Sequence, residues 1–305
     1  GNSVAIDSAD NVYVLGYTES AGSGGADFLL AKYNSAGTIQ WQRVLGGASS
    51  ELGYSVAFDS SDNVYLFGYT DSTGAGSVDF LLAKYNPAGT IQWQRTLGGS
   101  AWDYANSVAI DSSNNVYIFG YTENAGAGVY DLLLAKYNSS GALQWQRTLG
   151  TTDYDQGYAV AIDSSDNVYV NGYASAGQGS RDFIIAKYNS SGTLQWQRTL
   201  GGSAYDVGNS IAIDPSDNIL AFGLTASAGR GYEFLLAKLP NDGSLTGTYV
   251  LNSTNFVYAA SSLTGATSSL TSGTSSLNAS TSSLPSGALS LTDAGASLTS
   301  YLVEL

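Results

Sequence analysis

The sequence predicts an all-β protein in which a four-stranded unit is repeated along the chain. A segment that begins as Ser3-Val4-Ala5-Ile6-Asp7 returns about every fifty residues. Within each unit, four short runs rich in Val, Ile, Tyr, Phe, Leu and Trp alternate with turn-forming residues, which is typical of strands. The composition of the 305-residue chain, with 37 Gly and 12% charged residues, is too apolar for a disordered chain and too rich in Gly for a helical one.

The second unit illustrates the expected strands, which are residues 55–58, 63–69, 79–85 and 90–97. Clusters of Asx, Ser, Pro and Gly separate these runs and suit tight turns. The run Phe80-Leu81-Leu82-Ala83 is apolar on both faces, so the sheet is expected to be covered on both sides. These features predict a β-propeller of four-stranded antiparallel blades, whose repeats are about 40 to 50 residues long.

Five units can be counted, and they predict a propeller domain over residues 1–251 followed by a tail over 252–305. The unit bounds are 1–47, 48–99, 100–151, 152–202 and 203–251. The tail could supply a sixth blade. Because the chain starts within a unit and without Met, we expect it to be a processed or partial sequence.

The second unit resembles the bacterial beta-propeller repeat (SBBP) family. The strings that carry the resemblance are YSVAFD at 54–59, NVYLFGYT at 63–70, AKYN at 83–86 and GTIQW at 89–93. The resemblance covers residues 1 to about 250. It implies a propeller fold and an extracellular or surface protein.

The amino-acid composition excludes several classes of function. The chain has no Cys, Met or His, so it lacks thiolate nucleophiles, imidazole bases and His or Cys zinc ligands. We therefore expect no enzyme, no metal and no cofactor. A net charge of −14, from 11 Lys and Arg against 25 Asp and Glu, argues against a nucleic-acid partner. The absence of a long apolar run argues against membrane insertion.

Repeated charged residues are interpreted as structural. The Asp-Ser-Ser-Asp-Asn turns lack the Gly and distal Glu of an EF-hand loop, so they are predicted to be Asx turns and not calcium sites. The repeated cations are expected to pair with blade carboxylates or to cover tryptophan, and the alternative is a functional ring. The cations are Lys32, Lys84, Lys136, Lys187, Lys238, Arg43, Arg95, Arg147 and Arg198, and the expected carboxylates are Asp27, Asp79, Asp131 and Asp182.

The loops of a four-stranded meander fall at two ends of the blade. One end carries turns that hardly change between units, and the other carries loops that vary, where recognition is usually grafted. Aromatic rings beside carboxylates suit sugars, because rings stack on pyranose faces while Asp accepts hydrogen bonds from hydroxyls. Plugging of the channel, or stapling of neighbouring blades, is an equal alternative. The candidate ligand-binding residues are Trp102, Asp103, Tyr104, Tyr130, Tyr154, Asp155, Arg181, Tyr205, Asp206 and Tyr232.

The tail repeats leucine every seven residues, at Leu263, Leu270, Leu277, Leu284, Leu291 and Leu298. The period favours an oligomeric stalk, either coiled coil or β-wound, that hides its leucines between chains. The alternative is a flexible Ser/Thr linker. A propeller on such a stalk resembles phage tail fibres and bacterial surface adhesins.

These observations predict a recognition module outside a cell or on a virion. Its expected partners are a surface glycan or cell-envelope receptor, other copies of itself, and appendage or virion proteins. The first alternative is a purely architectural filament or appendage subunit. The second is a polysaccharide-degrading propeller enzyme whose carboxylates would be Asp103, Asp155 or Asp206.

Overall fold

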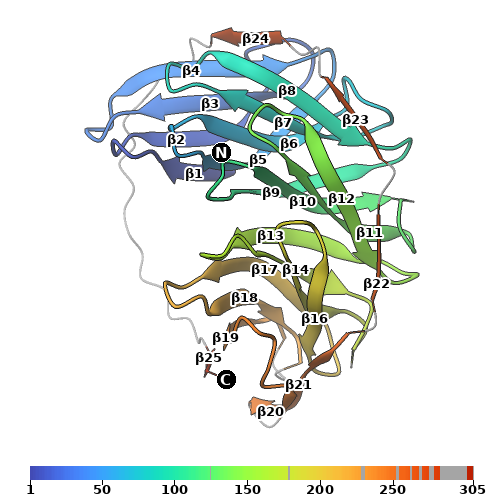
Figure 1. Cartoon of the computed structure of the whole chain (residues 1–305). Helices are drawn as coiled ribbons and strands as arrows, with labels where there is room; N and C mark the ends of the chain where they lie inside the picture. Colours follow the sequence, from blue (N-terminus) through green and yellow to red (C-terminus); the bar gives the residue numbers. More distant parts are fainter. Residues whose placement is uncertain are drawn as a thin grey trace.

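The structure, a computed structural model, describes residues 1–123, 125–177, 179–227, 231–251, 254–261, 263–267, 270–274, 278–281 and 301–304. These residues form strands and turns without any helix, which confirms the all-β class. Five sheets follow one another in chain order, from the first at the upper left of Figure 1 to the fifth at the lower left. Each of the first four is built on four consecutive antiparallel strands.

The first two sheets contain β1 (Ser3–Ile6), β2 (Val12–Thr18), β3 (Asp27–Tyr33), β4 (Ile39–Gly46), β5 (Glu51–Phe58), β6 (Val64–Thr70), β7 (Asp79–Tyr85) and β8 (Ile91–Gly98). The third and fourth contain β9 (Asp103–Ile110), β10 (Val116–Glu123), β11 (Tyr130–Tyr137), β12 (Leu143–Gly150), β13 (Gln156–Ile162), β14 (Val168–Ala174), β15 (Asp182–Tyr188) and β16 (Leu194–Gly201). The fifth contains β17 (Asp206–Ile213), β18 (Ile219–Thr225), β19 (Glu233–Leu239) and β25 (Tyr301–Glu304).

The four strands expected in the second unit are confirmed, with β6 and β8 each shifted by one residue and β5 longer than expected. Strand β5 starts at Glu51, four residues before the expected start at Ser55. A bulge between Gly53 and Ser55 lets the strand continue, so that Glu51 pairs with Thr70 beyond the irregularity.

Four apolar clusters fill the spaces between consecutive sheets, and every residue of β7 is buried. This confirms that the middle sheets are covered on both faces. Each cluster joins a large side chain of one sheet to aliphatic side chains of the next. Members that share a cluster across two sheets include Phe28 and Leu81, Phe80 and Leu133, Leu132 and Ile184, and Phe183 and Leu235.

The described part of the tail does not leave the sheets as a stalk, as the heptad favoured. It forms β21 (Thr254–Ala260), β22 (Thr264–Thr267), β23 (Thr271–Thr274) and β24 (Asn278–Thr281), which pair in turn with β16, β12, β8 and β4 (Figure 1). We call β21–β24 the belt. It runs backwards over the outer edges, from the fourth sheet to the first. Leucines 277, 284, 291 and 298 of the predicted stalk lie outside the described residues.

The register of the belt explains the seven-residue period. Belt residues that are seven apart pair with the arginine of each outer strand: Ala260 with Arg198, Thr267 with Arg147, Thr274 with Arg95, and Thr281 with Arg43. One heptad therefore covers one sheet. The buried Leu263 fills the space between the third and fourth sheets as part of their shared cluster.

The end of the fifth unit differs from the other four. Strand β20 (Gly247–Leu251) does not complete the fifth sheet but pairs with β21 on the fourth. The described residues that flank β19 on its outer side are those of β25, which runs parallel to it. The sequence signal for this change is the loss of the Trp-Gln-Arg segment in the fifth unit.

Candidate functional site

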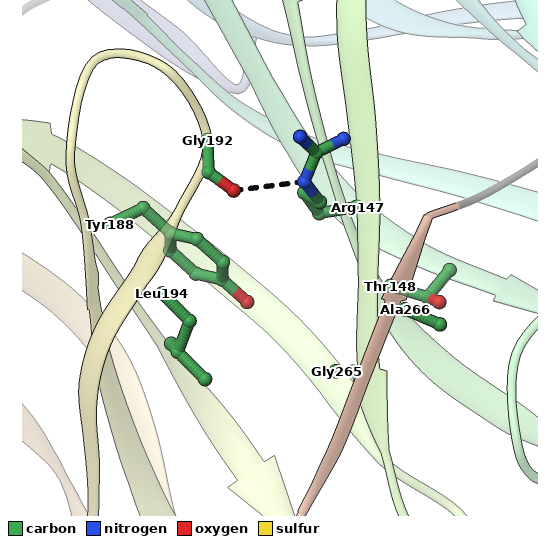
Figure 2. Close-up of a pocket in the computed structure, with 7 residues that line it drawn as sticks. All are labelled: Arg147, Thr148, Tyr188, Gly192, Leu194, Gly265 and Ala266. Atoms are coloured by element: carbon green, nitrogen blue, oxygen red, sulfur yellow. Dashed lines mark hydrogen bonds between the residues drawn. The ribbon is translucent and has the colours of Figure 1, made fainter.

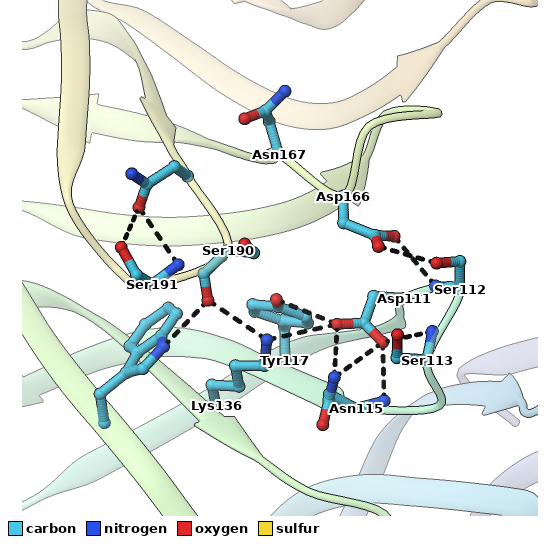
Figure 3. A network of polar contacts seen from close by, with 12 residues as sticks. Asp111, Ser112, Ser113, Asn115, Tyr117, Lys136, Asp166, Asn167, Ser190 and Ser191 are labelled. Atoms are coloured by element: carbon cyan, nitrogen blue, oxygen red, sulfur yellow. Dashed lines mark hydrogen bonds and ion pairs between the residues drawn. The ribbon is translucent and has the colours of Figure 1, made fainter.

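The end of the sheets that carries the short turns is occupied by structural contacts. In Figure 3 the Asp111 carboxylate accepts hydrogen bonds from Asn115 and the Tyr117 hydroxyl, and it lies 3.3 Å from the Lys136 ammonium. Burial raises the pKa of Asp111, but these hydrogen bonds and Lys136 lower it more, and the net pKa is below its usual value. The carboxylate is thus satisfied within its own Asx turn.

The lysines pair with carboxylates other than those expected. The sequence reasoning matched them to Asp27 and its repeats, but each ammonium reaches the aspartate at the end of the first strand instead. The pairs are Lys32–Asp7, Lys84–Asp59, Lys136–Asp111, Lys187–Asp163 and Lys238–Asp214. The expected covering of tryptophan by arginine is confirmed, as in Arg95 over Trp93 at 5.4 Å.

The same turns fasten each sheet to the next. The Ser112 hydroxyl donates to Asp166 at 2.7 Å, and the Trp145 ring nitrogen donates to the carbonyl of Ser190 at 3.3 Å. Arg147 Nε donates to the carbonyl of Gly192 at 2.8 Å. Because its side chains are used in this way, the turn end offers few free groups to a ligand.

The opposite end is built by the variable loops. Residues at or just before the start of a third strand form parallel bridges with residues that precede the first strand of the next sheet. These bridges join Val78 to Trp102, Tyr130 to Tyr154, and Arg181 to Tyr205. The bridging backbone brings variable loops of neighbouring sheets side by side, so their side chains form one surface.

Aromatic rings run along this surface in contact with one another. Tyr104 stacks on Tyr121 with centroids 4.8 Å apart, and Trp102 lies 5.6 Å from Tyr104. Tyr130 touches both Tyr121, at 5.5 Å, and Tyr154, at 5.4 Å. Such contacts fix the rings in place, which lowers the entropy cost of binding a ligand on them.

Arg181 carries a positive charge into the aromatic row. Its guanidinium lies 4.5 Å from the Tyr173 ring centroid and donates a 2.9 Å hydrogen bond to the Tyr205 hydroxyl. Burial lowers the pKa of Arg181, but the hydrogen bond to Tyr205 and the neighbouring phenols raise it further, so the group stays charged. The row continues from Tyr205 to Tyr232, 6.1 Å away.

We call this surface the aromatic face. It comprises Trp102, Tyr104, Tyr121, Tyr130, Tyr154, Arg181, Tyr205 and Tyr232, together with the buried Tyr173 that Arg181 covers. Trp102, Tyr154 and Tyr232 are exposed and stand furthest into solvent. All seven aromatic and arginine candidates predicted from the sequence lie on this face.

The three predicted carboxylates lie elsewhere. Asp103, Asp155 and Asp206 are buried beneath the loops and hold them by hydrogen bonds from backbone N–H groups of Gly99, Thr151 and Gly202. Their burial disfavours direct hydrogen bonds from ligand hydroxyls, and it equally disfavours these residues as a glycosidase pair.

Two residues of the face were missed by the sequence reasoning, Tyr121 and Tyr173. Both belong to the nearly constant Gly-Tyr segment at the end of a second strand, so their repetition suggested a structural role. Burial raises the pKa of both phenols. The signal that could have found them is their strand register, which places Tyr121 opposite Tyr104.

A pocket of about 290 Å³ lies away from the aromatic face, between the third and fourth sheets under the belt. Figure 2 shows Tyr188 and Leu194 on one side and Gly265 and Ala266 of β22 on the other. No group of three or more acidic side chains that could hold a metal ion occurs among the described residues. No helix in the described ranges is long and apolar enough to cross a bilayer.

Comparison with known proteins supports the repeat. The model of the SBBP family, a beta-propeller repeat, matches residues 40–74 and 92–126, which confirms the resemblance read from the sequence. An uncharacterized WD repeat-containing protein of Acanthamoeba polyphaga mimivirus is 26% identical over 196 residues, which is 50% of this chain and 14% of that protein. Regulatory protein FlaEY of Caulobacter vibrioides is 26% identical over 56% of this chain and 23% of its own length. The chain thus spans less than a quarter of either relative.

Two solved structures correct one expectation. A GH43 protein from Bacillus licheniformis aligns over 94% of this chain and 57% of its own, with a TM-score of 0.38 and 12% identity. A candidate gluconolactonase aligns over 82% of this chain and 93% of its own, with a TM-score of 0.36 and 9% identity. Both descriptions name enzymes. The expectation that this chain is not an enzyme, drawn from its missing His and Cys, is corrected, because carboxylates alone can hydrolyse a glycosidic bond and the chain has 25 Asp and Glu.

Proposed function

We propose that the five sheets are propeller blades and that the aromatic face binds a surface glycan. The observation that carries the proposal is two groups of contacting rings at the end of the sheets that structural contacts leave free. One group includes the exposed Trp102 and Tyr154, and the other ends at the exposed Tyr232. On this proposal the chain is displayed outside a cell or on a virion, as in an adhesin or tail fibre, with a cell-envelope polysaccharide as its partner.

The chemistry of the face suits a neutral or acidic sugar. Exposed rings offer flat apolar surfaces to pyranose C–H groups, and the phenols supply hydrogen bonds to hydroxyls. Burial raises the pKa of Tyr158, which lies beside Tyr173, to about 12, so this hydroxyl is protonated at neutral pH. Arg181 adds a positive charge that could recognise a carboxylated sugar.

Glycan-array binding tests the proposal. We expect the triple variant Trp102→Ala, Tyr154→Ala, Tyr232→Ala to lose binding by at least about a hundredfold, since each exposed ring contributes about 1 to 3 kcal/mol when it anchors a ligand. A matched control is Ser113→Ala, Ser165→Ala, Ser216→Ala, which changes three exposed side chains at the opposite end. Equal binding by both triple variants, or no binding of the unmodified chain to any surface polysaccharide, would sink the proposal.

A further inference from the structure

Each sheet has two faces, one toward the preceding sheet and one toward the following sheet. In the second, third and fourth sheets both faces are covered, and Phe67, Phe80 and Leu81 of the second sheet are 0% exposed. Among the described residues, no sheet covers the following face of the fifth sheet or the preceding face of the first. Their outward faces show what such a surface looks like when it is left open.

The following face of the fifth sheet is apolar and exposed. Phe222 and Phe234 each have 38% of their surface exposed, although they occupy the positions of Phe67 and Phe80. Leu220 and Leu236 lie on the same face and are half-buried. Two phenylalanines and two leucines thus form an open patch across β18 and β19.

The preceding face of the first sheet is also apolar and exposed. Val4 is 65% exposed, whereas its counterpart Val56 is 9% exposed beneath the first sheet. Val14 and Leu29 are half-buried, whereas their counterparts Leu66 and Leu81 are buried. This face keeps the same apolar residue types that the chain buries at each internal junction.

The four internal junctions of the chain show what kind of surface covers such faces. At every internal junction, the following face of one sheet packs on the preceding face of the next sheet. The occupant that matches each open face is therefore another four-stranded sheet of the same repeat.

We propose that the two open faces dock on one another between copies of this chain, the fifth sheet of one copy against the first sheet of the next. Such a contact is head-to-tail, so it extends into a filament or closes into a ring of chains. The interface is distinct from the aromatic face, and it gives the architectural role a physical basis that does not depend on glycan binding.

Concentration-dependent mass measurement of the full chain tests the docking. We expect oligomers by analytical ultracentrifugation and at least about tenfold weaker association in Phe234→Asp and in Val4→Asp, since a charge would be buried in the contact. Trp102→Asp, on the aromatic face, is the control and should associate normally. Far-UV circular dichroism verifies that each variant folds. A chain that stays monomeric at all concentrations overturns the proposal.

Cross-linking tests the geometry independently, because the chain has no Cys. At the junction of the fourth and fifth sheets Asn171, the counterpart of Phe222, donates a 2.8 Å hydrogen bond to the carbonyl of Ser210, the counterpart of Ser3. We therefore expect an equal mixture of the single variants Ser3→Cys and Phe222→Cys to form a disulfide-linked dimer of the two. If the double variant instead closes a disulfide within one monomer, the faces meet inside one chain and the proposal is wrong.

Discussion

At the scale of single residues, glycine positions reveal a close pairing of carboxylates between sheets. A Cβ on Gly98 would lie 1.7 Å from Asp79 Oδ1 and 2.8 Å from Asp103 Oδ2, so only glycine leaves room for both carboxylates. Gly150 stands in the same relation to Asp131 and Asp155. These aspartates, buried under the variable loops, support the backbone that carries the aromatic face.

The carboxylate pair predicts a stability that falls as pH rises. Burial raises the pKa of Asp103 to about 7, with smaller raising effects from Asp79 and Glu123, whereas Thr122 and the Gly99 N–H lower it. Because the folded-state pKa exceeds the unfolded value of about 4, ionisation above pH 4 favours unfolding, by up to a few kcal/mol once pH passes 7. We expect the free energy of unfolding in urea to decrease from pH 5 to pH 8.

Asp103→Asn should flatten this pH dependence, since its amide keeps an oxygen for the Gly99 N–H but cannot ionise. Asp111→Asn is the contrasting variant. The pKa of Asp111 is lowered, so its contribution is present above pH 4 and is lost only in more acidic solution. An unchanged slope between pH 5 and pH 8 in Asp103→Asn would contradict the assignment.

At the scale of elements, the belt depends on the outer strands. Gln197 and Gln146, each next to a repeated Trp, donate 2.9 Å hydrogen bonds to the carbonyls of Leu263 and Leu270. The Trp-Gln-Arg segment therefore has three uses: Trp and Arg fasten the next sheet, and Gln fastens the belt.

Removing one of these glutamines should loosen the belt without unfolding the sheets. We expect Gln197→Ala to cost about 1 kcal/mol and to speed proteolysis within residues 254–267. Gln195→Ala is the matched control, because that exposed side chain donates only to Thr193 nearby. Equal proteolysis rates in the two variants would show that the hydrogen bond to Leu263 does not retain the belt.

The sheets were predictable because each strand run and turn is local and is repeated along the chain. The belt was not, because its period matches the spacing of outer strands that lie far away in sequence: Thr281 pairs with Arg43. The candidate site likewise has a part that the sequence could predict and a part that it could not. Exposed loop rings such as Trp102 could be predicted from variation, but the burial of Asp103 depends on Gly98 and Asp79 of the neighbouring sheet, which sequence spacing does not reveal.

At the scale of the whole molecule, each sheet is packed mainly against its sequence neighbours. Stability in such a stack is close to a sum of unit and junction contributions. The inner sheets have two junctions each, whereas the first and fifth have one and expose Val4 and Phe222. The molecule should therefore be least stable at its two ends.

Hydrogen exchange checks this gradient. We expect amides of β6 to exchange at least about tenfold more slowly than those of β18 at protein concentrations too low for association. The difference should shrink at high concentration if the fifth sheet becomes covered. Uniform exchange across all five sheets at low concentration would instead indicate a single cooperative unit.

The reversed course of the belt orders events during synthesis. The belt residues are made after β1–β19, yet the final described belt strand pairs with β4 of the first sheet. Docking of the whole belt therefore requires that every intervening sheet has already folded, with its outer strand at the spacing that seven belt residues span. Pairing of the whole belt therefore reports that all four of these sheets have folded. In a chain with one misfolded sheet, the belt should stay unpaired and open to proteases.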